Sequence, residues 1–211
     1  MQPSSASFPP ELFRRQDELA DAAFYEAPRL VVHIDGPAIE AVTTYLGQAL
    51  PADAAVLDLM SSWRSHLPAS VAPARVAGLG MNGIELAENP QLGTRIVHDL
   101  NSNPVLPLES NAFDAAIVTV SIQYLVRPIE VFREVSRVLR QGGVFHVIFS
   151  NRLFPTKAVA VWQSLPDPRR RAELIAGYFA AAGGWAEPQF FDQSPGRQSD
   201  PVYVVRAAAA G

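Results

Sequence analysis

Five short runs that read as strands constrain the fold of this chain more than any other feature. The first two are continuously apolar, which is typical of strands that are covered on both faces. Stretches with helical spacing of apolar residues separate several of the runs. Strands that alternate with helices predict an α/β domain with a doubly wound, mostly parallel sheet. The runs are 54–60, 75–81, 94–100, 113–121 and 143–151.

Helices are expected before, between and after these runs. Residues 11–25 have rough helical spacing, and Pro28 ends that helix because proline cannot continue the hydrogen-bond ladder. Pro37 suits the first turn of a second helix. Gly142-Gly143 is expected to end an amphipathic helix that precedes the fifth run. Helices are predicted at 83–89, 129–140 and 169–182, and two closing strands at 188–193 and 201–207.

The chain reads as one folding unit behind an N-terminal extension. Its 211 residues are enough for one domain of ordinary size. No internal repeat and no long linker divides it. We expect residues 1–50 to form a helical extension or cap, and residues 51–211 to form the Rossmann-like domain that carries the sheet.

Composition excludes several classes of protein. Hydrophobic residues make up 48% and charged residues 18%, which indicates a globular chain. Lys+Arg 17 against Asp+Glu 21 leaves a net charge of −4, so there is no basic footprint for nucleic acid. With Cys 0, disulfides and cysteine nucleophiles are excluded. The histidines lack the spacing of metal ligands, so we expect no metal.

Targeting signals are missing from the sequence as well. No apolar run approaches the roughly 18–20 residues that span a bilayer, and the N-terminus has no signal-peptide core. We therefore expect a cytoplasmic protein with no membrane partner. Lys157 is the only lysine among 17 basic residues. Together with the Ala-rich composition, this indicates the coding bias of a bacterial gene rather than a chemical role.

Ligands of doubly wound sheets bind beyond the carboxyl ends of the strands. The residues that follow the predicted strands are therefore the first candidates for a site. They are 58–65, 80–82, 99–101, 119–124 and 150–152.

Residues 111–151 carry the most specific pattern in the chain. They contain FDAA, then YLVRP, a helix that ends in VLRQGG, and an apolar strand. This segment resembles the fourth strand, the following helix and the fifth strand of class I S-adenosylmethionine-dependent methyltransferases, of a type 11-like kind, and the likeness covers residues 54–150. The resemblance implies a seven-stranded Rossmann-like sheet that closes with a hairpin. It also implies S-adenosyl-L-methionine as cofactor and an unidentified small or medium-sized methyl acceptor.

The loop after the first strand departs from the family pattern. That family has an acidic residue followed by glycines, and glycine lets the backbone approach the cofactor closely. Here Asp58 is followed by a loop without glycine, in which Met60 and Trp63 place bulk near the expected methionine portion of the cofactor. The hydroxyls of Ser61 and Ser62 can bond a carboxylate and offset part of this loss.

A second departure lies at the end of the second strand. The family has an acidic residue there that accepts from the ribose hydroxyls, whereas this chain has Gly80. Asn82 is a substitute acceptor, but a neutral one, and charge-assisted hydrogen bonds are roughly twice as strong as neutral ones. The spacing of Gly78, Gly80 and Gly83 is only a weak match to a dinucleotide motif.

The end of the third strand follows the family pattern. Asp99 matches the carboxylate that accepts from the adenine amino group; alternatively, Asp99 or Asn101 caps a turn. The resemblance therefore implies one set of cofactor-binding residues. They are Arg29, Asp58, Met60, Ser61, Ser62, Gly80, Met81, Asn82, Asp99, Leu100, Asn101, Val120 and Ser121.

The N-terminal extension supplies the candidate catalytic residues, His33 and Tyr25. In the family such an extension folds over the cofactor and shapes the acceptor pocket. Arg29 is suited to clamp a carboxylate and His33 to act as a general base near neutral pH. The alternative is that Arg29 and Asp35 form a structural ion pair and that His33 caps a turn.

Two classes of function remain open at this point. The first is a methyltransferase with a small-molecule acceptor, and the second is a non-catalytic relative that binds another ligand or a protein partner. An open cavity at the ends of the first two strands, with Trp63 turned aside, favours the first. Met60 and Trp63 filling that volume favours the second.

Overall fold

A seven-stranded sheet forms the centre of the molecule, in the order β3-β2-β1-β4-β5-β7-β6. This computed structural model describes residues 8–210. Strand β7 runs antiparallel to both of its neighbours, and the other pairings are parallel. The predicted fold class is confirmed. The strands are β1 (Val56–Leu59), β2 (Val76–Gly80), β3 (Thr94–Val97), β4 (Phe113–Thr119), β5 (Leu139–Phe149), β6 (Gln189–Asp192) and β7 (Tyr203–Ala208).

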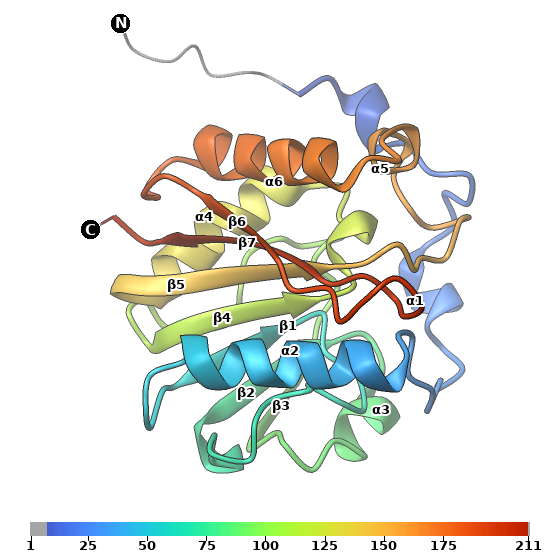
Figure 1. Ribbon diagram of the computed structural model, residues 1–211. Coiled ribbons are helices and arrows are strands. Elements are labelled where there is room, and N and C mark those ends of the chain that lie inside the picture. Colours follow the sequence, from blue (N-terminus) through green and yellow to red (C-terminus); the bar gives the residue numbers. More distant parts are fainter. Residues whose placement is uncertain (1–7, 211) are drawn as a thin grey trace, which may run out of the picture.

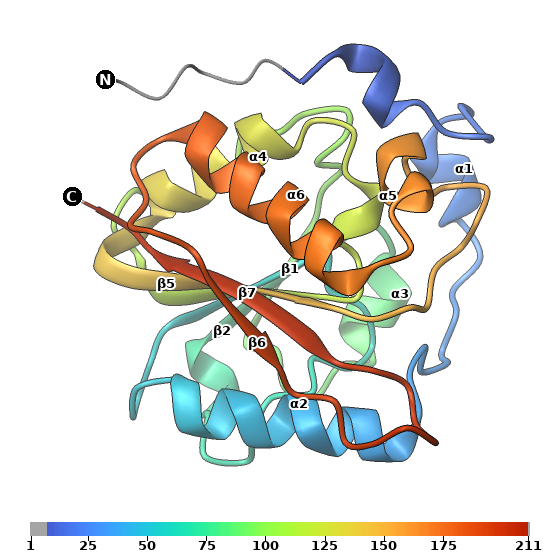
Figure 2. The same cartoon turned by 45° about the horizontal axis from the view of Figure 1, so that its top comes forward.

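Helices cover both faces of the sheet (Figures 1 and 2). Helix α2 (Gly36–Ala49) packs on one face, and α4 (Pro128–Val138) and α6 (Pro168–Ala182) pack on the other. Asp35 begins α2 as its N-cap, accepting from the backbone N–H of Ala38 at 3.0 Å. The shorter helices are α1 (Asp21–Phe24), α3 (Gly83–Ala87) and α5 (Ala160–Ser164). The division at residue 50 stays a prediction, and α2 belongs to the layer that packs directly on the sheet.

The connection between β1 and β2 is irregular. Its residues 60–75, all of them described, form no α-helix and only one 3₁₀ turn, Pro73–Arg75. A helix that starts after a strand would offer its free backbone N–H groups to an anion. Here the end of β1 lacks such a helix, so other groups must meet any negative charge bound there.

The predicted helix at 11–25 is wrong. Only a 3₁₀ turn (Pro10–Phe13) and the short α1 form there. Residues 14–35 form an N-terminal strap, which runs along the edge of the sheet where the parallel strands end (Figure 1). Outside α1, the backbone of the strap bonds to the 156–160 segment. Asp17 N–H donates to the carbonyl of Thr156 at 2.9 Å, and Ala160 N–H donates to that of Arg14 at 2.8 Å. Tertiary pairing therefore overrides the local helical pattern.

The predicted end of α4 at Gly142-Gly143 is also wrong. Helix α4 ends at Val138, and both glycines lie inside β5. Gly142 N–H donates to the carbonyl of Ala209, and Ala209 N–H donates to that of Gly143. The glycines thus serve strand pairing, and Gly142 supplies a left-handed turn of the backbone with φ of 76°.

Candidate functional site

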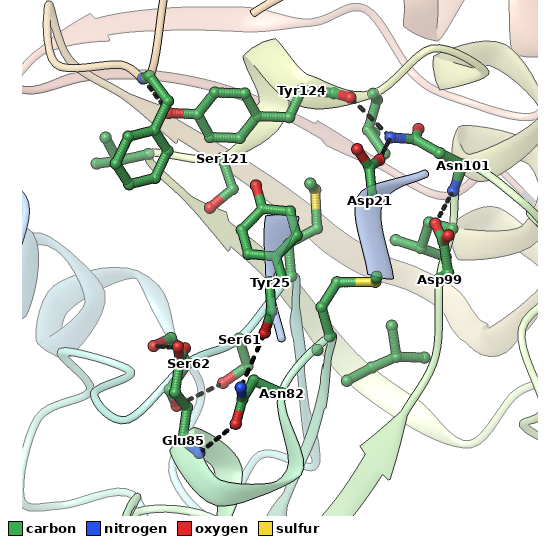
Figure 3. A pocket seen from close by; sticks show the side chains of 18 of the residues that line it. Asp21, Tyr25, Ser61, Ser62, Asn82, Glu85, Asp99, Asn101, Ser121 and Tyr124 are labelled. Atoms are coloured by element: carbon green, nitrogen blue, oxygen red, sulfur yellow. Dashed lines mark hydrogen bonds between the residues drawn. The ribbon is translucent and has the colours of Figure 1, made fainter. Parts of the chain in front are cut away.

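A cavity of about 280 Å³ lies beyond the carboxyl ends of β1, β2 and β4, under the N-terminal strap. Its size is close to the lower end of the roughly 300–1,000 Å³ typical of ligand sites. Figure 3 shows Tyr25 in the middle of this cavity, with Asn82 and Glu85 on one side and Asp99 and Asn101 on the other. The predicted site residues that line it are Tyr25, Arg29, His33, Met60, Ser61, Ser62, Gly80, Met81, Asn82, Asp99, Leu100, Asn101, Val120 and Ser121.

Trp63 is turned away from this cavity. Its indole N–H donates to the carbonyl of Val31 at 2.8 Å, and the guanidinium of Arg64 lies 3.9 Å from its ring centre. The ring borders a separate hollow of about 70 Å³. Met60 does line the cavity, in a left-handed conformation with φ of 53°. The loop thus keeps a backbone turn that usually favours glycine while placing a thioether there.

Gly80 permits the close approach of the loop after β1 to the end of β2. Ser61 N–H donates to the carbonyl of Leu79 at 2.8 Å, which brings the Ser61 backbone across Gly80. A Cβ added at Gly80 would lie 2.1 Å from the carbonyl oxygen of Ser61. The acidic residue of the family pattern has no room at this position, which gives a physical reason for the second departure.

The Asn82 amide is fully occupied by the protein. Its oxygen accepts from the backbone N–H groups of Ile84 and Glu85 and caps α3, while its nitrogen donates to the carbonyls of Tyr25 and Glu26. An acceptor for ribose hydroxyls needs a free lone pair, and this geometry leaves none at Asn82. Asn82 instead ties the strap to α3.

Glu85 is a buried carboxylate at the cavity that the sequence analysis did not single out. It accepts from the Arg29 backbone N–H at 2.7 Å and from the hydroxyl of Ser62. Glu85 therefore joins the strap to the loop after β1. Acidic residues are ordinary in the first turn of a helix, so no pattern in the sequence marks Glu85 as a site residue.

Asp58 is the one predicted cofactor-binding residue that does not line the cavity; it borders the smaller hollow. The hydroxyl of Ser61 donates to it at 2.6 Å. Burial raises the pKa of Asp58 to about 6, against the lowering effect of hydrogen bonds from Ser61 and Ser65. Asp58 therefore acts on the cavity by holding the loop that lines it.

Asp99 combines the two roles that the sequence left open. One carboxylate oxygen accepts from the backbone N–H groups of Asn101 and Ser102 and so caps the turn. The second oxygen has no hydrogen-bond partner among the described residues, although Asp99 lines the cavity. It is free to accept from a ligand. The Asn101 amide, in contrast, is bonded to Asp21, Tyr124 and the backbone of Val126.

Arg29 and Asp35 do not form the ion pair considered as an alternative. Asp35 caps α2 and accepts from the hydroxyl of Ser199. Arg29 packs its guanidinium 4.4 Å from the ring centre of Phe24 and donates from one terminal nitrogen to the Phe24 carbonyl. Its other terminal nitrogen is buried without a partner in the described part of the chain. Such a donor indicates a place for a ligand acceptor.

The two candidate catalytic side chains are both uncharged at pH 7 but differ in what they offer, one a base and the other a donor. Partial burial lowers the pKa of His33, helped by Arg29 and opposed by Glu85, so its imidazole is mostly neutral at pH 7. Burial raises the pKa of the Tyr25 phenol, which stays protonated. His33 makes no hydrogen bond with the described residues and so does not cap a turn; its ring centre lies 5.2 Å from that of Phe154. A free base and a phenol donor therefore both line the cavity.

The strap is held in place by a buried lysine. Lys157 donates to the carbonyl of Leu19 at 2.7 Å and lies 3.1 Å from the Asp17 carboxylate and 3.2 Å from that of Asp21. Asp21 also pairs with Arg15 at 2.7 Å. Lys157 thus has a structural role, which its being the only lysine of the sequence does not reveal.

Residues 8–210 contain no cluster of His, Cys, Asp or Glu side chains arranged to hold a metal ion. No helix within the same range is long and apolar enough to cross a membrane.

Comparison with known proteins finds a methyltransferase domain and methyltransferase-like folds. The family model of the methyltransferase domain matches residues 70–147, beginning after the loop without glycine. A methyltransferase from Mesorhizobium loti, said to depend on S-adenosylmethionine, is 16% identical over 80% of this chain and 97% of its own, with a TM-score of 0.53. Another, from Thermotoga maritima, is 15% identical over 82% and 89%, with a TM-score of 0.56. The cyclase SpnF is 16% identical over 90% and 91%, with a TM-score of 0.57. No curated protein sequence matches.

Residues 70–147 thus match the methyltransferase domain, and the whole chain shares its fold with methyltransferases that depend on S-adenosylmethionine. A cyclase with the same fold illustrates that the fold alone does not fix the reaction. The roles of individual residues must therefore be argued from the cavity itself.

Proposed function

We propose that this chain transfers a methyl group from S-adenosylmethionine to a small or medium-sized acceptor. The observation that carries the proposal is the open cavity beyond β1, β2 and β4, which holds unsatisfied groups of two kinds. Asp99 offers a free carboxylate oxygen, and Arg29 offers a buried guanidinium nitrogen without a partner. The proposal further includes a cytoplasmic location and a bacterial source, both of which rest on the sequence.

These groups fit the chemistry of the cofactor. Asp99 suits the adenine amino group, with apolar side chains such as Leu100 and Val120 beside it. Arg29 suits the carboxylate of the methionine portion, because β1 is not followed by a helix whose N-terminus would hold an anion. The Ser62 hydroxyl already donates its proton to Glu85, which also accepts from the Arg29 backbone N–H, so Ser62 holds the loop beside Arg29.

The remaining side chains suit the transfer step. When bound, the cofactor supplies a methyl group on a positively charged sulfur, open to in-line attack by a nucleophile. His33 is neutral and accepts the proton that an oxygen or nitrogen acceptor loses. Tyr25 keeps its phenol proton and donates a hydrogen bond within the cavity. The strap that carries both residues covers the cavity and limits its access to water.

The alternative of a non-catalytic relative requires Met60 and Trp63 to fill the cofactor volume. Trp63 instead bonds to Val31 outside the cavity, which remains open. The arrangement of this loop therefore favours the enzyme over the binding protein.

Asp99→Asn is expected to weaken the binding of S-adenosylhomocysteine roughly tenfold, because the free oxygen becomes an amide donor. The amide oxygen of the variant still caps the turn at Asn101, so stability should change little. Isothermal calorimetry measures the affinity and urea unfolding measures the stability. Asp192→Asn is the matched control, because Asp192 caps a turn at Ser194 in the same way on an exposed strand. Equal affinities for Asp99→Asn and wild type would remove Asp99 from the proposed site.

A further inference from the structure

Two arginine side chains, Arg29 and Arg152, line the cavity in a protein whose net charge is −4. Arg29 and the neutral His33 both lie close to the ring of Phe154. The Arg29 guanidinium lies 5.6 Å from the ring centre of Phe154, and the His33 ring lies 5.2 Å from it. Arg152 stands two residues before Phe154 and lines the same cavity. Cationic side chains at the mouth of a cavity attract anions to it.

Arg152 is fixed at one edge and open at the other. Its Nε donates to the Asp200 carboxylate at 2.7 Å, while its side chain is 60% exposed. Asp200 is itself buried and accepts from the backbone N–H of Asp35 at 3.0 Å. The two terminal nitrogens of Arg152 bond to none of the described residues. A guanidinium oriented in this way presents a ready pair of donors to a carboxylate or phosphate.

Most acidic residues of the cavity already have partners within the protein, and the free oxygen of Asp99 is assigned to the cofactor by the proposed function. Asp21 is neutralised by Arg15 and Lys157. Glu85 already accepts from Arg29 N–H and from Ser62. Asp200 offsets one positive charge, and Arg29 remains without an ion-pair partner among the described residues.

The walls next to Arg152 are aromatic. Phe154 stacks on Tyr124 with ring centres 5.9 Å apart, and Tyr25 lies opposite in the cavity (Figure 3). Flat apolar groups pack well against such rings. A molecule that used both features would place a flat body between the rings and an acidic group toward solvent.

We propose that the methyl acceptor is an anion, a small molecule with a flat apolar body and a carboxylate or phosphate that pairs with the terminal nitrogens of Arg152. This inference rests on the proposed function, since it names the acceptor of that same site. Arg152 sets specificity, while Arg29 is left for the cofactor. Pairing at the mouth directs the opposite end of the acceptor into the cavity, which His33 and Tyr25 also line.

The test uses protein saturated with S-adenosylhomocysteine and three probes of similar shape. They are 4-hydroxybenzoate, phenyl phosphate and the neutral 4-hydroxybenzamide, titrated by calorimetry. We expect at least one anion to bind roughly tenfold tighter than the amide, because a hydrogen bond to a charged group is stronger than a neutral one. The two anions distinguish a carboxylate acceptor from a phosphate one. Equal binding of amide and anions, or no binding of either anion, would overturn the inference.

Arg152→Gln should remove the preference for the anion and leave the affinity for S-adenosylhomocysteine unchanged. Arg170→Gln is the matched control, because Arg170 is 66% exposed and also pairs with a single carboxylate, that of Glu173. Unchanged anion binding in Arg152→Gln would contradict the role of Arg152. Failure of wild type to bind S-adenosylhomocysteine would instead overturn the proposed function, and this inference with it.

Discussion

Replacing Gly80 by aspartate, the type of residue that the family has at this position, is expected to weaken the site instead of restoring it. The first side-chain carbon would lie 2.1 Å from the Ser61 carbonyl oxygen and 3.1 Å from the Ser61 carbonyl carbon. Both are backbone atoms, so relief requires the whole loop after β1 to move. Gly80→Ala already introduces this overlap and should cost about 3 kcal/mol of folding free energy, as overpacked sites do.

The same movement displaces Ser61 and Ser62 from the cavity wall. Both Gly80→Ala and Gly80→Asp should therefore bind S-adenosylhomocysteine more weakly than wild type, by at least an order of magnitude. Urea unfolding and calorimetry measure the two effects. Gly36→Ala is the control glycine variant, since a carbon added there would meet nothing within 4 Å. Wild-type stability and affinity in Gly80→Ala would show that the loop does not cross Gly80 as described.

Lys157→Met is expected to destabilise the protein by about 3 kcal/mol. The change keeps much of the side-chain volume but leaves the buried Asp21 carboxylate with one cationic partner instead of two, and removal of one member of a buried ion pair is costly. The Leu19 carbonyl also loses its donor. Because these contacts hold the strap, trypsin should cleave the variant faster at Arg14, Arg15 and Arg29.

Chemical unfolding at pH 7 and timed proteolysis measure these effects. Arg170→Met, which breaks an exposed ion pair on α6, should change neither stability nor cleavage appreciably. If Lys157→Met were as stable and as resistant to trypsin as wild type, the strap would be held by its apolar contacts and not by the lysine.

The centre of the sheet was predictable from sequence because β1, β2 and β4 are largely apolar runs with few alternative placements. The strap was not predictable, because its conformation depends on Lys157, which lies far along the chain from Asp17 and Asp21. A local pattern of apolar residues in 11–25 carries no information on that partner. Likewise, Gly142 and Gly143 look like a helix end until β7 is known to pair with them.

Most of the predicted site residues line one cavity because the ends of parallel strands meet at one edge of a sheet. Their individual roles depend on contacts that the sequence does not show. Asn82 looked like a free acceptor but is occupied on both sides of its amide. Glu85 and Arg152 carried no motif, and only the folded chain brings them to the cavity.

Cofactor binding by the unmodified protein tests the central claim most directly. Calorimetric titration with S-adenosylmethionine, and separately with S-adenosylhomocysteine, should give micromolar dissociation constants, roughly −8 kcal/mol of binding free energy. Such a result would show that this chain holds the cofactor without the glycine loop and the ribose acid. No heat and no thermal shift at millimolar concentrations of either ligand would contradict the account.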